Sequence, residues 1–135
     1  MAVAGSITTT TSDLGGGYTK YSIAWVCSAG GVVSENAVAV KRGHIHQAKF
    51  IPDGGGTQPT DLYDLTLVDA ISGGVDHLTG IGANLSNATR KIGVPQVGDG
   101  TTAYQRVFHE GGDLYPTIAA AGNAKGGTIV LVMGA

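Results

Sequence analysis

The sequence has few charged residues. Of its 135 residues, 13% are Asp, Glu, Lys or Arg, and the formal net charge is −2. A typical soluble domain carries about 25% charged residues. The chain therefore lacks the basic surface that binds nucleic acid and the polybasic stretch that binds an anionic membrane. A low charge content is expected of a protein that packs against other subunits, because interface cores are depleted of charge.

Cysteine and long apolar runs are also scarce. Cys27 is the one cysteine, which excludes an internal disulfide. Beside Trp25 and Val26 it is expected to be a small buried residue of a strand, not a nucleophile. No apolar run reaches the about 18 residues of a membrane span, and residues 1–11 lack the features of a signal peptide. We expect one domain and no membrane partner.

Glycine, in contrast, is abundant. The chain has 23 glycines, many of them in runs such as 15–17, 30–31 and 54–56. Glycine reaches positive φ without steric cost, so these runs mark chain reversals. The stretches between them are rich in Val, Ile, Thr and Tyr. This pattern predicts an all-β fold, an antiparallel β-sandwich with the jelly roll as one candidate topology.

Strands are expected where apolar and polar residues alternate or β-branched residues cluster. In the stretch 18–28, Tyr21, Ile23 and Trp25 share the face that would be buried. A hairpin loop is expected at 28–31, leading into the next strand. The expected strands cover residues 18–28, 32–40, 43–51, 62–70, 104–108, 114–121 and 128–133.

The N-terminal segment, 1–12, is expected to be a flexible arm that precedes the sandwich domain at 13–135. Residues 6–12 are β-branched and polar, with little apolar content to bury. An extended arm that gains partners only on assembly fits this composition better than an internal strand. The expected contacts with a partner protein are Ile7, Thr8, Thr9, Thr10 and Thr11.

The last stretch, 128–133, is nearly all apolar. Such a run is typical of a strand that is buried on both faces or covered by a neighbouring subunit. We therefore expect an oligomer interface that includes Ile129, Leu131 and Met133.

Two histidines one residue apart, His44 and His46, are the first candidate site. On a strand they face the same way, which is how some metal sites begin. The spacing is common by chance, so we interpret both as solvated or interface histidines and assign no metal and no cofactor. A third ligand would have to come from a distant segment: His77, His109 or Asp76.

The carboxylates do not form a catalytic pattern. A glycosidase needs two of them at a defined separation in a cleft lined with aromatic residues, and the chain has one Trp, five Tyr and two Phe. EF-hand, phosphate-loop and nucleophile-elbow motifs are missing. The sequence therefore assigns no catalytic residue. The carboxylates at loop edges are expected to bond nearby backbone N–H groups: Asp61, Asp64, Asp69 and Asp76.

Several segments resemble small structural proteins of tailed bacteriophages. They are residues 50–53 (Phe-Ile-Pro-Asp), 63–69 and 76–86, and the closing segment 121–133 is similar to the last hairpin of such proteins. The shared pattern is one of glycines and aspartates around strands, from Lys41 onward. The family includes capsid decoration proteins, head fibres, knobs and small tail components, and it implies no catalytic residues.

The resemblance is strongest to capsid decoration (cement) proteins. It implies a homotrimer on the outer surface of the head that binds the major capsid protein, in a virion assembled in the bacterial cytoplasm. The arm would lie on the capsid and add a strand to a capsid sheet edge. The alternative is a head fibre, knob or tail-associated protein with a receptor- or glycan-binding role. The exposed aromatic residue that a sugar requires would then be Tyr63 or Tyr104.

Overall fold

A computed structural model of the chain describes residues 5–98 and 104–134. These residues form eleven strands and one short 3-10 turn, Gly55–Thr57, and no α-helix. The strands are antiparallel and belong to curled sheets, which confirms the predicted all-β, sandwich-like fold. Within the described ranges, no helix has the length and apolar character needed to cross a membrane.

The larger sheet has six strands. It begins with the hairpin of β1 (Ser6–Gly15) and β2 (Tyr18–Val26), and β2 also pairs with the C-terminal strand β11 (Gly126–Gly134). β11 pairs in turn with β4 (Gly43–Pro52). The far side of β4 carries two short strands: β6 (Lys91–Gly93) and β9 (Phe108–His109).

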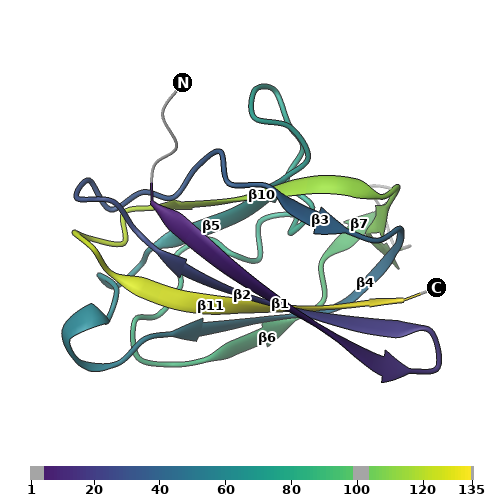
Figure 1. Cartoon of the computed structure of the whole chain (residues 1–135), viewed down its shortest axis with the longest axis horizontal. Helices are drawn as coiled ribbons and strands as arrows, with labels where there is room; N and C mark the ends of the chain where they lie inside the picture. The colour runs from purple at the N-terminus through teal and green to yellow at the C-terminus, as the bar shows by residue number, and fades with distance from the viewer. Residues whose placement is uncertain (1–4, 99–103, 135) are drawn as a thin grey trace.

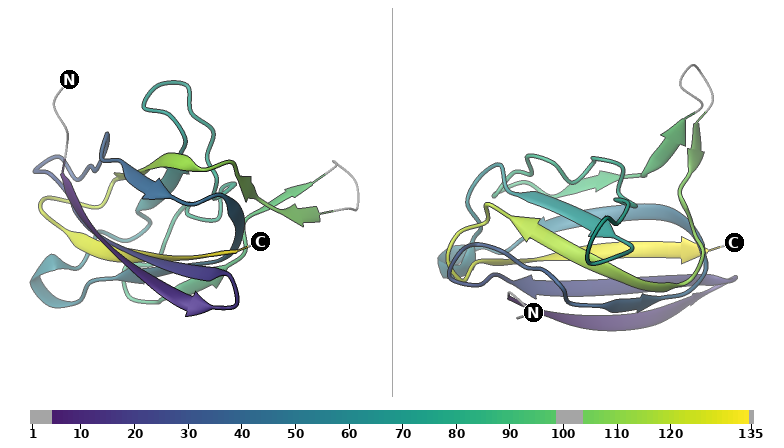
Figure 2. Two further views of the ribbon diagram at one scale, coloured as in Figure 1. Left: turned by 45° about the vertical axis from the view of Figure 1, so that its right-hand side comes forward. Right: turned by 90° about the horizontal axis from the view of Figure 1, so that it is seen from above.

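The smaller sheet has the order β3, β10, β5 and faces the larger one (Figure 1). A separate hairpin projects from the body of the molecule in both views of Figure 2. The strands of the smaller sheet are β3 (Val38–Val40), β10 (Gly112–Ala119) and β5 (Asp64–Val68), and those of the hairpin are β7 (Gln96–Gly98) and β8 (Tyr104–Arg106).

The core lies between the two sheets and follows the predicted alternation. Tyr21, Ile23 and Trp25 of β2 are all buried, as the sequence predicted. Because successive side chains of a strand point to opposite faces, each strand supplies every second residue to this layer. β5, β10 and β11 supply further buried residues: Leu65, Leu67, Leu114, Ile118, Ile129, Leu131 and Met133.

The free N-terminal arm predicted at 1–12 is wrong for its described part. β1 pairs with β2 along its whole length, from Ser6 opposite Val26 to Gly15 opposite Tyr18. Threonine favours strands even where it buries little, and Gly15, Gly16 and Gly17, with φ of 80°, 63° and 85°, close the hairpin. Residues 1–4 of the predicted arm lie outside the described residues.

Two further strand predictions need correction. Residues 28–31 do not form a hairpin loop, because β2 and β3 belong to different sheets and this loop carries the chain from one to the other. Of residues 32–40, only β3 forms a strand, while Val33 makes an isolated bridge to Ile118. The strand expected at 104–108 is two strands, β8 and β9, which are separated by the buried Val107.

Candidate functional site

β1 is the outermost strand of the larger sheet. One of its edges pairs with β2, and no other strand in residues 5–98 and 104–134 pairs with its outer edge. An unpaired edge presents backbone N–H and C=O groups to any chain that approaches as an additional strand. Asp13 is the one charged residue of β1, and its carboxylate accepts the N–H of Gly15 at 2.8 Å. The edge therefore carries little charge that would oppose pairing.

The edge of the smaller sheet at β5, in contrast to the outer edge of β1, is covered. Segment 76–85 runs beside β5 and bonds to it through the backbone. The Leu65 N–H donates to the Gly82 carbonyl, and the Leu67 carbonyl accepts the N–H of His77, both at 2.8 Å. The β5 edge is thus covered by its own chain, whereas the outer edge of β1 has no such cover among the described residues.

The predicted contact residues divide into two groups. Thr8, Thr9, Thr10 and Thr11 are exposed, so they remain candidates for contact with a partner. Ile7 is half-buried and packs against the core, so its side chain belongs to the fold and is not a free contact. A shallow groove of about 340 Å³ adjoins β1 and runs toward the smaller sheet, lined by Thr11, Tyr21, Ala39, Val40, Lys41 and Gly112.

The predicted oligomer interface at the C-terminus is wrong. Ile129, Leu131 and Met133 are at most 2% exposed and point into the core of their own chain. β11 lies between β2 and β4, so its apolar run fills the middle of the sandwich. The outward residues of β11 are Val130 and Val132, which are half-buried. Lys20 of β2 lies opposite Val132, and Lys49 of β4 lies opposite Val130.

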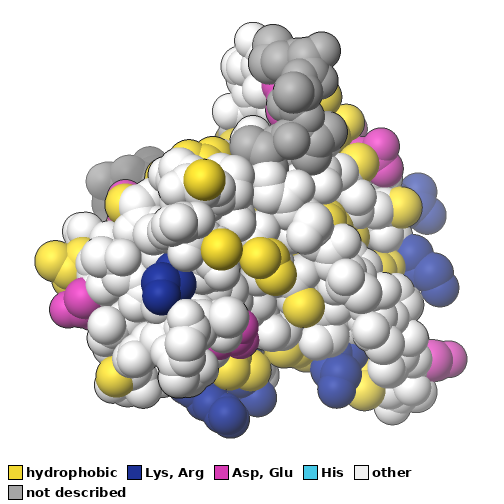
Figure 3. All heavy atoms as spheres, turned by 60° about the vertical axis from the view of Figure 1, so that its left-hand side comes forward, with side chains coloured by type: hydrophobic (Ala, Val, Ile, Leu, Met, Phe, Trp, Pro, Cys, Tyr) yellow, Lys and Arg dark blue, Asp and Glu magenta, His cyan; other side chains and the backbone are white. Residues whose placement is uncertain are grey.

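The three central strands of the larger sheet contain no Asp or Glu. Their charged side chains, apart from histidines, are Lys20 on β2 and Lys49 on β4. Exposed apolar side chains accompany them at Val26, Ile92 and Phe108. The outward side of these strands therefore has little charge to desolvate on contact with another protein. On the side of the molecule that lies at the left in Figure 1, uncharged atoms also predominate, with apolar and charged side chains scattered among them (Figure 3).

The carboxylates at loop edges bond backbone N–H groups, but nearby ones, as predicted, only for Asp69 and Asp76; the partners of Asp61 and Asp64 lie 26 and 20 residues further along the chain. Asp61, Asp64 and Asp69 each accept one, at 3.1, 2.8 and 2.8 Å. Asp76 accepts three, two through Oδ1 and one through Oδ2. These carboxylates therefore shape the loops at residues 69–87 around β5.

The four histidines make three separate ring contacts that the sequence did not predict. His44 lies against Phe108, with ring centroids 5.1 Å apart, and His46 lies against Tyr18 at the same distance. His77 and His109 contact each other, with centroids 5.3 Å apart. No group of three or more His, Cys, Asp or Glu residues in the described chain is arranged to hold a metal ion. The ligand set considered from the sequence therefore does not assemble around His44.

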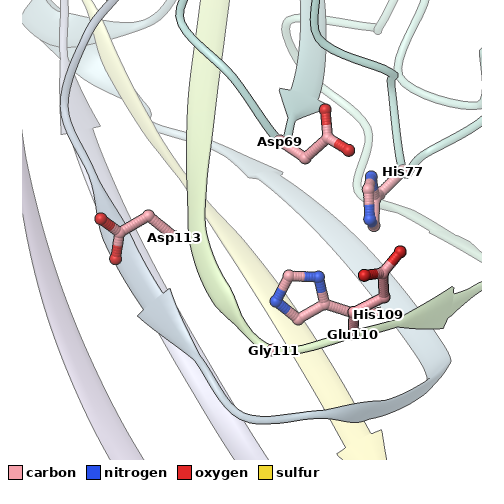
Figure 4. Close-up of a pocket in the computed structure, with 6 residues that line it drawn as sticks. All are labelled: Asp69, His77, His109, Glu110, Gly111 and Asp113. Carbon is pink, nitrogen blue, oxygen red and sulfur yellow. The ribbon is translucent and has the colours of Figure 1, made fainter.

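His77 and His109 open onto a pocket of about 250 Å³ at one end of the smaller sheet (Figure 4). The pocket joins the loop after β5 to the turn between β9 and β10. Sequence reasoning named both histidines only as partners for His44, because nothing in the sequence shows that these two segments meet. The other lining residues are Asp69, Glu110, Gly111 and Asp113.

Tyr63 is not the exposed aromatic residue that a glycan site requires. Its side chain is 1% exposed and packs on Trp25, with ring centroids 5.5 Å apart. Burial, reinforced by the charge of Asp53, raises the pKa of Tyr63 to about 12. The side chain of Tyr104 lies outside what the structure describes.

Cys27 is buried, as the sequence predicted, but it directly follows β2 and is not part of a strand. Burial raises the pKa of its thiol from 9.0 to about 11. Since the thiolate is the reactive form, this thiol is held in its inert state at neutral pH.

Comparison of the chain with protein-family models, curated proteins and solved structures gives no significant match. Its function must therefore be argued from its own residues and geometry.

Proposed function

We propose that this protein is a bacteriophage capsid decoration protein that attaches to the outer surface of the head by strand addition at β1. The observation that carries the proposal is the open edge of β1, ten residues long with a single charge. An extended segment of the major capsid protein would pair with this edge, and the exposed threonines would fix its register.

Two other features support a role in adhesion. The central strands of the larger sheet lack carboxylates, and their outward valines offer a surface for a second copy of the chain or for the capsid. The hairpin of β7 and β8 projects from the sandwich (Figure 2). A two-stranded hairpin alone is marginally stable in water, so packing against a neighbouring subunit would stabilise it.

In this proposal the protein acts as a homotrimer at capsid three-fold points. Each copy repeats one contact on one of three capsid subunits, so individually weak contacts gain by avidity. A ligand that binds only the assembled state stabilises it by mass action. Surface buried across a boundary between capsid proteins therefore raises the free energy needed to separate them.

Attachment through β1 is tested by adding charge to its outer edge while the strand itself is kept. Thr8→Lys with Thr10→Lys places two lysines on exposed positions of β1, where edge lysines oppose further pairing. The matched control is Ala88→Lys with Thr89→Lys, which makes the same charge change in an exposed loop. Binding to heads stripped of the protein is measured by cosedimentation, and circular dichroism checks the fold.

We expect the β1 variant to lose at least tenfold in affinity for heads, while the loop control binds like the native chain. Equal occupancy of heads by the β1 variant and the native chain would refute attachment through this edge. Light scattering of the purified protein tests the trimer separately, since a mass of three chains at micromolar concentration is expected.

A further inference from the structure

The pocket at one end of the smaller sheet brings two imidazoles into contact from distant parts of the chain. His77 lies in the loop after β5, and His109 ends β9. Their rings are 5.3 Å apart between centroids, at an interplanar angle of 75°. Both line the pocket of about 250 Å³, and Figure 4 shows how they reach it, His77 from the loop after β5 and His109 from the end of β9.

His109 has one ring nitrogen fixed and one available. The side chain is 3% exposed. Its Nε2 lies 3.2 Å from the carbonyl oxygen of Val40 and 3.1 Å from that of Gly112. Two carbonyl oxygens can only accept, so Nε2 carries the proton of the neutral ring. Nδ1 is then a lone-pair nitrogen, and it lies on the side of the ring that faces the pocket in Figure 4.

His77 is held in the complementary tautomer. Its Nδ1 lies 3.1 Å from the carbonyl oxygen of Val75, so Nδ1 donates and Nε2 keeps a lone pair. Its backbone N–H donates to the Leu67 carbonyl at 2.8 Å, which anchors the residue to β5. Each histidine of the pair therefore offers one unprotonated nitrogen, and a backbone carbonyl determines which one.

Metal-binding histidines are held by backbone carbonyls in the same way. A ligating imidazole donates its other N–H to a carbonyl or carboxylate, which fixes the ring and its tautomer. Two imidazoles on one tetrahedral ion, with metal–nitrogen bonds of about 2.0–2.1 Å, have ring centroids about 5 Å apart. The 5.3 Å separation of the His77 and His109 rings is compatible with this value.

The charges around the pair favour a cation. Asp69, Glu110 and Asp113 line the same pocket, and none of the described residues that line it is a Lys or Arg. Asp69 already accepts the N–H of Val75 through Oδ1, which leaves Oδ2. As placed, no third described group completes a ligand set, so water or a turn of the exposed Glu110 side chain would supply the remaining positions.

We propose that His77 and His109 together bind one divalent transition-metal ion of the Zn²⁺ type, with Asp69 and Glu110 as the nearest carboxylates. Imidazole nitrogen with carboxylate oxygen suits Zn²⁺, Ni²⁺ and Cu²⁺ better than Ca²⁺ or Mg²⁺. The ion would tie β9 of the larger sheet to the loop after β5 of the smaller one. This inference is independent of capsid attachment, since the pocket does not include β1.

The test is titration of the full chain, freed of metal, with ZnCl₂ in a calorimeter. We expect one ion per chain and a rise in the thermal midpoint, because an ion that binds only the folded state stabilises it. His77→Gln should weaken Zn²⁺ binding at least tenfold. The matched control, His44→Gln, removes a histidine from the larger sheet and should leave binding unchanged.

A second measurement avoids variants altogether. In a nitrogen-15 spectrum of the histidine rings, Zn²⁺ should shift the signals of His109 Nδ1 and His77 Nε2 and leave those of His44 and His46 in place. The proposal is overturned if Zn²⁺ produces no saturable shift, if it shifts His44 and His46 instead, or if His77→Gln binds Zn²⁺ as tightly as the native chain.

Discussion

The Asp76 carboxylate accepts the backbone N–H of Leu67, nine residues earlier, at 2.9 Å. The same Oδ1 atom accepts the N–H of Leu78, and Oδ2 accepts that of Gly80. One side chain therefore ties the loop that carries His77 to the edge of β5. It also supplies acceptors for backbone donors that the loop would otherwise leave without partners.

Replacement of this carboxylate should destabilise the fold. Asp76→Ala leaves partly buried N–H groups unsatisfied, at a cost of about 1–3 kcal/mol each. We expect the free energy of unfolding in urea to fall by at least about 2 kcal/mol. Asp13→Ala is the control, because it removes a single exposed bond to Gly15. A loss for Asp76→Ala no larger than that for Asp13→Ala would contradict the assignment.

Gly127 allows β11 to pass close to Trp25. A Cβ at this position would lie 2.6 Å from the indole ring and 3.0 Å from the Ile51 carbonyl oxygen. Gly127→Ala should therefore cost about 1–3 kcal/mol through overpacking and should shift the fluorescence of the single tryptophan. Gly54→Ala is the matched control, since nothing lies within 4 Å of its added Cβ. Unchanged stability and emission in Gly127→Ala would show that the strands do not approach this closely.

The buried faces of β11 can be tested by truncation. Leu131→Ala should lower the free energy of unfolding by about 2–5 kcal/mol, because it leaves a cavity in the core. Val130→Ala, on the outward side of the same strand, should cost clearly less. Both are measured by urea unfolding, with the solution mass followed by light scattering. If Leu131→Ala changed the oligomeric state and left the stability of the fold intact, the residue would belong to an interface after all.

The raised pKa of Cys27 makes stability depend on pH in the alkaline range. The folded state holds the thiol proton where the unfolded chain, with a pKa of 9.0, has released it. This contribution to stability is complete below about pH 9 and is lost as the pH rises toward about 11. Urea unfolding at intervals over this range should show the decline, and Cys27→Ala should lessen it. Tyr63 adds a decline of the same sign from about pH 10 to about 12.

The alternation of apolar and polar residues predicted most of what could be predicted of the fold from the sequence. In a half-buried strand every second residue is apolar, because alternate side chains point into the core. This alternation identified β2 and its buried face through Tyr21, Ile23 and Trp25. β1 was misjudged because an edge strand buries little, so its composition resembles that of an arm. Ile129 and Leu131 were identified as apolar, but only the strand order shows that β11 is central and that its own chain covers them.

The candidate sites were less predictable than the fold. The bonds of Asp69 and Asp76 to backbone N–H groups within nine residues are local, and a local pattern predicted them. Asp61 and Asp64 bond N–H groups 26 and 20 residues further along the chain, and these partners could not be read from the local sequence. The meeting of His77 with His109 depends on how β5, β9 and β10 are placed in space. No periodicity or spacing along the chain encodes that placement, so both residues were visible only as isolated histidines.

The larger sheet is asymmetric at its two ends. β1 offers ten residues at one end, while the strands beyond β4 at the other end are three residues or shorter. A strand added at β1 therefore finds no matching long edge on the far side to continue the sheet. If β1 joins a sheet of another protein as proposed, the subunit would end that sheet, because the larger sheet has no second long edge strand among the described residues to continue the pairing. Copies of such a chain would then cover a surface without linking to one another into fibres.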